Sequence, residues 1–281
     1  PELSFRPRAA YAPWRAELRE KFLSLTGLSR MPAPPADAHF SVEKEEKKDG
    51  YRQIYFTFES EAGAVVPCYL LIPDTGREKY PVVITLQGHS TGFHNSVGEI
   101  KYEQYDRDYQ PRGQFAIQAV REGYIALAIE QRAMGCRAAD NMPFRQLYVG
   151  ERPNCYYESM TALLLGRTMV GERCYDVSRA IDQLAHFPEC DTGKIAITGN
   201  SGGGTISYYA AAYDARIGLS MPSCAFCPYR ESIARVYHCS CNYIPHALRY
   251  FDMQDLAALI APRPLTIVSG ILDELFHISG V

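Results

Sequence analysis

The chain has 281 residues, 47% of them hydrophobic and 22% charged, a composition that is typical of a globular protein and excludes a disordered or fibrous chain. Lys and Arg number 29 against 32 Asp and Glu, so the net charge of -3 provides no basic field for nucleic acid or an anionic membrane. No run approaches the roughly 18 apolar residues of a membrane helix, and residues 1–11 lack the apolar run of a signal peptide. We expect a soluble cytoplasmic protein, a provisional localisation because the chain starts at Pro1 without an initiator Met.

The first predicted element is a helix over residues 11–28. Apolar side chains such as Leu18 and Phe22 recur at helical spacing, and Gly27 ends the pattern. The run 43–49 mixes both signs of charge, which favours a solvated edge strand or loop over a binding tract.

The rest of the chain alternates β-rich and helical segments. Two β-rich runs joined by a short polar connection predict an antiparallel hairpin from 54–58 and 65–72. Short apolar runs that are typical of buried parallel strands occupy residues 82–86, 125–129, 195–198 and 265–268. Helices are expected at residues 115–122, 160–186 and 203–213. This order predicts an α/β fold in which helices cover both faces of a mostly parallel central sheet, with the hairpin making the sheet mixed.

The most informative motif is Gly199-Asn200-Ser201-Gly202-Gly203. It directly follows one predicted strand and precedes a predicted helix. A nucleophile elbow needs this context, because its serine sits in a strained backbone conformation and the flanking glycines avoid collisions with the neighbouring strand and helix. A phosphate-binding turn also uses glycines at such a junction, but neither G-x-G-x-x-G nor a G-K-[ST] ending is present. Ser201 is therefore the candidate nucleophile.

Acyl transfer by such a serine also needs two N–H donors for the oxyanion. Gly202, the residue after the nucleophile, supplies the first. The loop after the predicted strand 82–86 begins Gln87-Gly88-His89. The backbone N–H of His89 is the candidate second donor, with a purely structural place in the loop as the alternative.

The acid of such a site follows the serine, at the end of a later strand. The predicted strand within 264–270 is followed by Asp273, with Glu274 as its immediate competitor. We favour Asp273 as the catalytic acid.

Several stretches together resemble the acetyl xylan esterase and dienelactone hydrolase-related branch of the α/β-hydrolases. They are residues 195–205 around the serine, 261–265 (Ala-Pro-Arg-Pro-Leu), 270–273, 166–167 (Gly-Arg) and 176–182. The resemblance runs from about Tyr51 to the end of the chain. It implies a serine esterase that removes acetyl or other small acyl groups, with Ser201 as nucleophile, Asp273 as acid, and His89 and Gly202 in the oxyanion hole.

The resemblance also implies a domain organisation. We expect residues 1–45 to form an N-terminal helical extension and residues 46–281 an α/β-hydrolase catalytic domain whose C-terminal strand and helix lie outside this chain. Gln87 departs from the branch, because many relatives carry His before the glycine; this weakens the oxyanion assignment of His89.

A catalytic serine needs a general base, which in that branch is a histidine after one more strand beyond the acid. His277 follows Asp273 by only four residues, too few for a crossover to another parallel strand. Three explanations are open: a base encoded beyond Val281, a histidine such as His238 or His246 recruited from the loops, or an inactive protein. We favour the first.

Nine cysteines, an odd number, favour reduced thiols over a disulfide framework. Cys224-x-x-Cys227 and Cys239-x-Cys241 invite comparison with a zinc site, but the second pair is too close for the usual spacing. We expect these cysteines to pack in the core, and we expect neither a metal nor an organic cofactor.

The prediction is thus a carboxylic ester hydrolase whose partner is a small-molecule or carbohydrate acyl ester, with a homo-oligomer compatible with the sequence. The alternatives are a peptidase related to prolyl oligopeptidases and an inactive hydrolase fold that serves as a binding protein. Two segments, 137–155 and 224–250, are expected to run over the carboxyl edge of the sheet and shape the substrate pocket. The aromatic residues considered for stacking on a sugar are Tyr148, Tyr156, Tyr157 and Tyr243, each with plain packing as its alternative.

Overall fold

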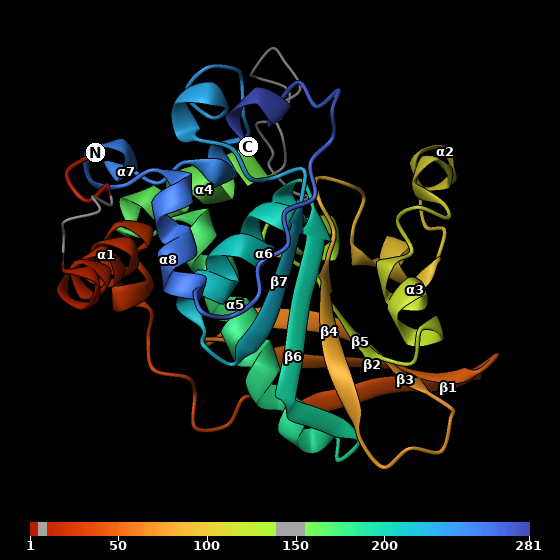
Figure 1. The fold of residues 1–281 in the computed structure, drawn as a ribbon. Helices are drawn as coiled ribbons and strands as arrows, with labels where there is room; N and C mark the ends of the chain where they lie inside the picture. The colour runs from red at the N-terminus through yellow and green to blue at the C-terminus, as the bar shows by residue number, and fades with distance from the viewer. Residues whose placement is uncertain (5–9, 139–154) are drawn as a thin grey trace.

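The computed structural model describes residues 1–4, 10–138 and 155–281. Its centre is a seven-stranded sheet of order β1-β2-β3-β5-β4-β6-β7 (Figure 1). The strands are β1 (Ser41–Lys48), β2 (Tyr51–Glu59), β3 (Val65–Pro73), β4 (Tyr80–Leu86), β5 (Ile125–Ile129), β6 (Cys190–Asn200) and β7 (Ile217–Ser223). The four strands β5, β4, β6 and β7 run parallel, whereas β1, β2 and β3 pair antiparallel, so the sheet is mixed.

Helices cover both faces of this sheet (Figure 1). They are α1 (Tyr11–Thr26), α2 (Glu103–Asp106), α3 (Phe115–Arg121), α4 (Cys155–Leu164), α5 (Met169–Gln183), α6 (Gly202–Tyr213), α7 (Ala247–Tyr250) and α8 (Ala257–Ile260). On one face α6 packs on β6 and β7 and is covered by α5 and α8; on the other, α3 packs on β3, β4 and β5. The predicted α/β fold, with helices on both faces of the sheet, is confirmed.

The position of each strand explains its composition. Every residue of β5 is buried, because this strand lies inside the sheet and both of its faces are covered. β1 is an edge strand with mostly exposed, charged side chains, as residues 43–49 predicted. Such charges keep an open edge from pairing with another chain.

Two predicted elements differ in detail. The helical segment 160–186 is two helices, α4 and α5, with Gly166 between them at a φ of 70°, in the left-handed region. The run 265–268 is not a regular strand, yet it lies parallel to β7. The Thr266 N–H donates to the Ser220 carbonyl at 2.9 Å, and the Val268 N–H to the Pro222 carbonyl at 3.0 Å. β7 itself was not predicted, because serine, glycine and proline interrupt its apolar pattern.

The N-terminal residues pack onto the main body. α1 contacts α5, α7 and α8, and β1 begins at Ser41. The proposed boundary between residues 1–45 and 46–281 stays a prediction.

Residues 224–250, here called the cap segment, follow β7 and run across the top of the molecule in Figure 1 as short turns and α7. Most of the other predicted excursion, 137–155, lies outside the described residues. Within the described ranges, no helix combines the length and apolar character that crossing a bilayer requires.

Candidate active site

The serine turn, residues 199–204, joins the end of β6 to the start of α6. Ser201 has a φ of 53° and a ψ of -119°, a combination that residues with a side chain rarely adopt. Its N–H donates to the Ser223 carbonyl at 2.9 Å, and its carbonyl accepts the N–H of Thr205 at 2.8 Å. The strained serine is therefore held between the ends of two strands and the first turn of a helix.

Close backbone packing requires glycine at several positions around Ser201. A Cβ at Gly203 would lie 2.2 Å from the Leu86 carbonyl oxygen. From the facing loop, a Cβ at Gly88 would lie 2.7 Å from the Asn200 carbonyl oxygen and 3.1 Å from the Ser201 Cβ. A side chain at either glycine would push apart the ends of β4 and β6, which bring the loop after β4 to Ser201.

The two predicted oxyanion donors lie side by side. A Cβ at Gly202 would be 3.0 Å from the Nδ1 of His89. Gly202 begins α6, so its N–H has no acceptor within the helix. The His89 carbonyl accepts the Tyr109 hydroxyl at 3.3 Å, which turns that carbonyl toward another loop. The residues meet next to Ser201, and their role as donors stays a prediction.

A cavity of about 530 Å³ opens beside Ser201, at the carboxyl ends of β4 and β6. Ligands of parallel α/β sheets usually bind at this edge. Besides the serine turn and the loop after β4, the lining includes Tyr109, Arg112 and Phe115. No sequence motif marks these three: Tyr109 and Arg112 come from the irregular connection after β4, and Phe115 is the first residue of α3.

Of the four tyrosines considered for sugar stacking, the three that the structure describes do not line this cavity. Tyr156 and Tyr157 pack edge-on against each other with ring centroids 5.5 Å apart, and Tyr243 lines a different cavity beside α7. Tyr148 lies outside the described residues. Among the described tyrosines, Tyr109 is the one placed beside Ser201.

The predicted acid lies on the loop after the segment that pairs with β7. The Asp273 Oδ1 accepts the N–H groups of Leu275 and Phe276, both at 2.9 Å. Its competitor Glu274 is exposed. The structure thus orders the Asp273 carboxylate, but Asp273 is not among the residues lining the cavity beside Ser201.

Within the described ranges, no histidine hydrogen-bonds the Ser201 hydroxyl. The Nδ1 of His277 lies 2.7 Å from the Ser279 hydroxyl, at the surface. The Nε2 of His238 lies 3.2 Å from the Leu275 carbonyl, so this ring rests on the loop that carries Asp273. Burial lowers the pKa of His238, whereas the Leu275 carbonyl and Asp273 act in the opposite direction.

A separate histidine and carboxylate pair stabilises the connection after β4. The His94 Nε2 lies 2.9 Å from the Asp106 Oδ2, which also accepts the N–H groups of Lys101 and Tyr102 at 2.7 and 2.8 Å. Burial opposes ionisation of Asp106, but hydrogen bonds from Thr91 and these N–H groups hold its pKa at about 2. The pair orders the connection that supplies Tyr109 to the cavity wall.

The His89 ring faces three cysteine thiols. Its Nε2 lies 3.4 Å from the Cys155 Sγ and 3.3 Å from the Cys241 Sγ, and the Cys155 Sγ is 2.6 Å from the Cys239 Sγ. Desolvation would lower the pKa of His89, but hydrogen bonds with Cys239 and Cys241 outweigh it and raise the pKa to about 9. The four donor atoms lie within 4.8 Å of one another.

This grouping differs from the one considered from sequence, which set Cys239 and Cys241 beside Cys224 and Cys227. Cys224 and Cys227 do not belong to the described cluster, and the Cys227 thiol instead faces the His277 carbonyl at 3.7 Å.

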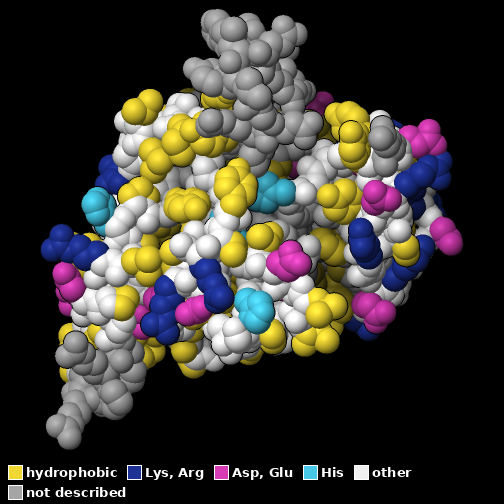
Figure 2. All heavy atoms as spheres, turned by 90° about the horizontal axis from the view of Figure 1, so that it is seen from above, with side chains coloured by type: hydrophobic (Ala, Val, Ile, Leu, Met, Phe, Trp, Pro, Cys, Tyr) yellow, Lys and Arg dark blue, Asp and Glu magenta, His cyan; other side chains and the backbone are white. Residues whose placement is uncertain are grey.

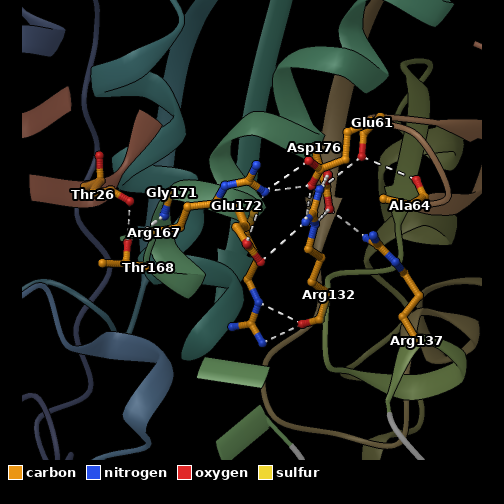
Figure 3. A network of polar contacts seen from close by, with 12 residues as sticks. Thr26, Glu61, Ala64, Arg132, Arg137, Arg167, Thr168, Gly171, Glu172 and Asp176 are labelled. Atoms are coloured by element: carbon orange, nitrogen blue, oxygen red, sulfur yellow. Dashed lines mark hydrogen bonds and ion pairs between the residues drawn. The ribbon is translucent and has the colours of Figure 1, made fainter. Parts of the chain in front are cut away.

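A buried ion network links the loop after β5 to α5 and to the β2–β3 hairpin (Figure 3). The Arg132 Nε pairs with Asp176 at 2.9 Å and its Nη1 with Glu61 at 2.7 Å, while Arg137 reaches Asp176 at 2.8 Å. Burial opposes ionisation of Asp176, but Arg137 and Arg132 hold its pKa at about 2. No local pattern marks this network, because its members come from distant segments.

Three comparisons relate the chain to known proteins. A family model described as the Abhydrolase family matches residues 1–207. "Putative hydrolase YtaP" of Bacillus subtilis (strain 168) is 25% identical over 218 residues, which cover 76% of this chain and 68% of YtaP.

Solved structures give the same fold. A "putative acetyl xylan esterase" of Bacteroides fragilis NCTC 9343 superposes with a TM-score of 0.79 at 22% identity, over 95% of this chain and 71% of that one. A glucuronoyl esterase from Solibacter usitatus gives a TM-score of 0.70 at 19% identity, over 98% of this chain and 80% of that one. These similarities show an α/β-hydrolase fold.

Proposed function

The chain belongs to the Abhydrolase family, and we propose that it is a serine hydrolase that cleaves small acyl esters of carboxylic acids. The observation that carries this proposal is the strained backbone of Ser201 beside a cavity at the carboxyl ends of parallel strands. This arrangement supports a nucleophile elbow, a turn that exposes the serine Oγ at the edge of the sheet. The names of YtaP and of the two structural relatives, all hydrolases or esterases, support the same class.

We propose the following reaction at Ser201. The Ser201 Oγ attacks the ester carbonyl carbon while its proton passes to a general base, and the N–H groups of Gly202 and His89 stabilise the resulting oxyanion. The N-terminus of α6 adds favourable electrostatic potential at the same point. The base returns the proton to the leaving alcohol, and water then hydrolyses the acyl-serine. We assign Asp273 the role of the acid that orients the base.

The substrate we propose is an acetyl-type ester on a carbohydrate. A cavity of about 530 Å³ suits a small ligand, and Tyr109 supplies an aromatic side chain for a sugar ring. The relatives named acetyl xylan esterase and glucuronoyl esterase support an ester of this kind.

The test is hydrolysis of p-nitrophenyl acetate and of acetylated xylan oligosaccharides. Ser201→Ala is expected to lower kcat by at least about 10³-fold, because the attacking oxygen is removed. Ser24→Ala, an exposed serine of α1, serves as the matched control and should retain the parent rate.

The outcomes also separate the alternatives. Cleavage of a proline-containing peptide without ester hydrolysis would favour the peptidase, and no turnover of either substrate by the parent protein would favour the binding protein. Equal ester hydrolysis by Ser201→Ala and the parent would overturn the assignment of Ser201.

A further inference from the structure

The side chains of His89, Cys155, Cys239 and Cys241, here called the thiol cluster, come from three separate parts of the chain. His89 lies in the loop after β4, Cys155 is the first residue of α4, and the other two cysteines belong to the cap segment. Cys155 is 66 positions from His89 and 84 from Cys239. Donor atoms from such distant segments meet only because the folded backbone brings them together.

The donor set is one that binds zinc. Three sulfurs and one imidazole nitrogen make up the Cys₃His set of structural zinc sites, which have four protein ligands and no open position. A tetrahedral zinc with bonds of about 2.3 Å to sulfur and about 2.0 Å to nitrogen separates a sulfur from the nitrogen by about 3.5 Å. In the structure the His89 Nε2 lies 3.4 and 3.3 Å from two of the sulfurs. The 2.6 Å between Cys155 and Cys239 must widen by roughly 1 Å, to the about 3.8 Å of two zinc-bound thiolates.

The cysteines of the thiol cluster lie in apolar surroundings, whereas His89 is exposed on the cavity side. Cys155 and Cys241 are 1% and 2% exposed, and they pack with Ala133 and Met169, with Cys239 against them. A protonated thiol can be buried without a ring nitrogen and further thiols around it, whereas a bound metal ion requires several such ligands. An apolar shell limits the access of water and stabilises a closed site.

A buried cation supplies the complementary charge. Arg173 is 2% exposed, and it donates from Nε and Nη2 to the Arg132 carbonyl at 3.0 and 2.7 Å. The same guanidinium also interacts with the Cys241 thiol. Zinc bound by three thiolates and a neutral imidazole carries a net charge of about -1. The guanidinium next to the cluster balances that charge.

We propose that His89, Cys155, Cys239 and Cys241 bind one zinc ion, which fastens the cap segment and the start of α4 to the wall of the cavity. With Nε2 on the metal, the His89 ring carries its proton on Nδ1, the atom next to Gly202. The ion thereby fixes both the orientation and the tautomer of a side chain at the proposed catalytic site. This proposal departs from the expectation that the cysteines only pack in the core.

The test is the metal content of the protein purified with reduced cysteines and measured by mass spectrometry of the elements. We expect about one zinc ion per chain for the parent and at least a roughly tenfold loss in Cys239→Ser and Cys241→Ser. Cys227→Ser is the matched control, because this cysteine also lies in the cap segment but outside the thiol cluster, and it should keep the parent zinc content.

A second measurement reads the metal site directly by its absorption spectrum. Replacement of zinc by Co²⁺ in the parent protein should produce the absorption bands of tetrahedral cobalt with thiolate charge transfer, and Cys241→Ser should weaken them. A parent protein that binds neither metal, or that contains a Cys155–Cys239 disulfide and no metal, would overturn the proposal. Because neither readout uses an ester, its failure is distinguishable from failure of the proposed function.

Discussion

The serine turn and the cap segment are held in place in different ways. In the serine turn the contacts are between backbones, as where Gly203 approaches the Leu86 carbonyl oxygen too closely for a side chain. In the cap segment few residues belong to regular elements, and side chains such as Cys241 meet partners far along the chain. The upper face that both regions share, seen in Figure 2, carries hydrophobic side chains across its middle and charged ones toward both of its sides.

This difference shows which parts of the structure are specified by adjacent residues and which by residues far apart in the chain. A turn between a parallel strand and a helix is specified by a few adjacent residues, because glycine and a strained serine leave little choice of conformation. A wall assembled from several segments depends on contacts that form only after the sheet has been built. Substitutions in the serine turn and substitutions in contacts between distant segments should therefore differ in their effects on kcat and on stability.

The largest expected effect concerns Asp273, the proposed catalytic acid. Asp273→Asn should lower kcat by about 10³-fold or more, because the amide cannot orient and stabilise the protonated base as a carboxylate does. Glu274→Gln, which changes an exposed neighbour, should stay within about twofold of the parent. Steady-state kinetics with p-nitrophenyl acetate decides between them, and a larger loss in Glu274→Gln would reverse the assignment.

The buried ion network tests how strongly the distant contacts matter. Arg132→Met should lower the free energy of unfolding by up to about 3–5 kcal/mol, because it removes the buried cation that Asp176 and Glu61 share and leaves each carboxylate with one arginine partner. Urea denaturation measures this loss. Arg235→Met removes an exposed pair with Glu231 and should cost less than about 1 kcal/mol. Similar losses in both variants would contradict the importance of the network.

The serine turn should respond to a single methyl group. Gly203→Ala should destabilise the fold by about 3 kcal/mol and lower kcat at least about tenfold, because the Cβ would collide with the Leu86 carbonyl oxygen. Gly218→Ala in β7, where the Cβ would meet the Ile195 carbonyl oxygen at an ordinary 3.5 Å, should change stability by less than about 0.5 kcal/mol. Equal stability of the two alanine variants would contradict the tight backbone packing of the serine turn.

Glu130, just after β5, should make a pH-dependent contribution to the free energy of unfolding. Burial raises the pKa of Glu130 to about 7, although the N–H groups of Cys136 and Phe93 oppose the shift. The folded protein thus favours the neutral acid, a stabilisation that is present below the unfolded pKa of about 4.3 and is lost as the pH rises to about 7.

The corresponding measurement is the slope of unfolding free energy against pH. Between pH 4.5 and 7, Glu130 should contribute a fall of up to about 1.4 kcal/mol per pH unit, and Glu130→Gln should remove this contribution. The slope is the readout, so a constant stability offset in the variant does not matter. An unchanged slope would show that Glu130 does not titrate in this range.

The smallest effect is expected for His277→Ala. The ring is exposed and pairs locally with Ser279, so kcat should stay within about twofold of the parent. His238→Ala, measured in parallel, reports on the ring that contacts the Asp273 loop. A large loss of kcat in His277→Ala would contradict this prediction and would identify His277 as the general base.

The sequence predicted the local features well. The helix near residues 11–28, the hairpin and the three strands at 82–86, 125–129 and 195–198 follow from periodicity, whereas 265–268 pairs with β7 without forming a regular strand. β7 was not predicted, because its partly exposed positions carry serine, glycine and proline in place of an apolar run.

The thiol cluster and the cavity wall could not be predicted in the same way. The Cys239-x-Cys241 pair was visible, but its partners were sought at Cys224 and Cys227 nearby, whereas the structure supplies His89 and Cys155. Sequence spacing gives no information about which distant loops meet above a sheet.

The most direct test of the account is to locate the adduct of a fluorophosphonate probe by mass spectrometry of the labelled protein and its peptides. We predict one probe per chain, bound to Ser201, and no labelling of Ser201→Ala. An adduct on another residue, or equal labelling of Ser201→Ala and the parent, would contradict the central claim that Ser201 is the nucleophile.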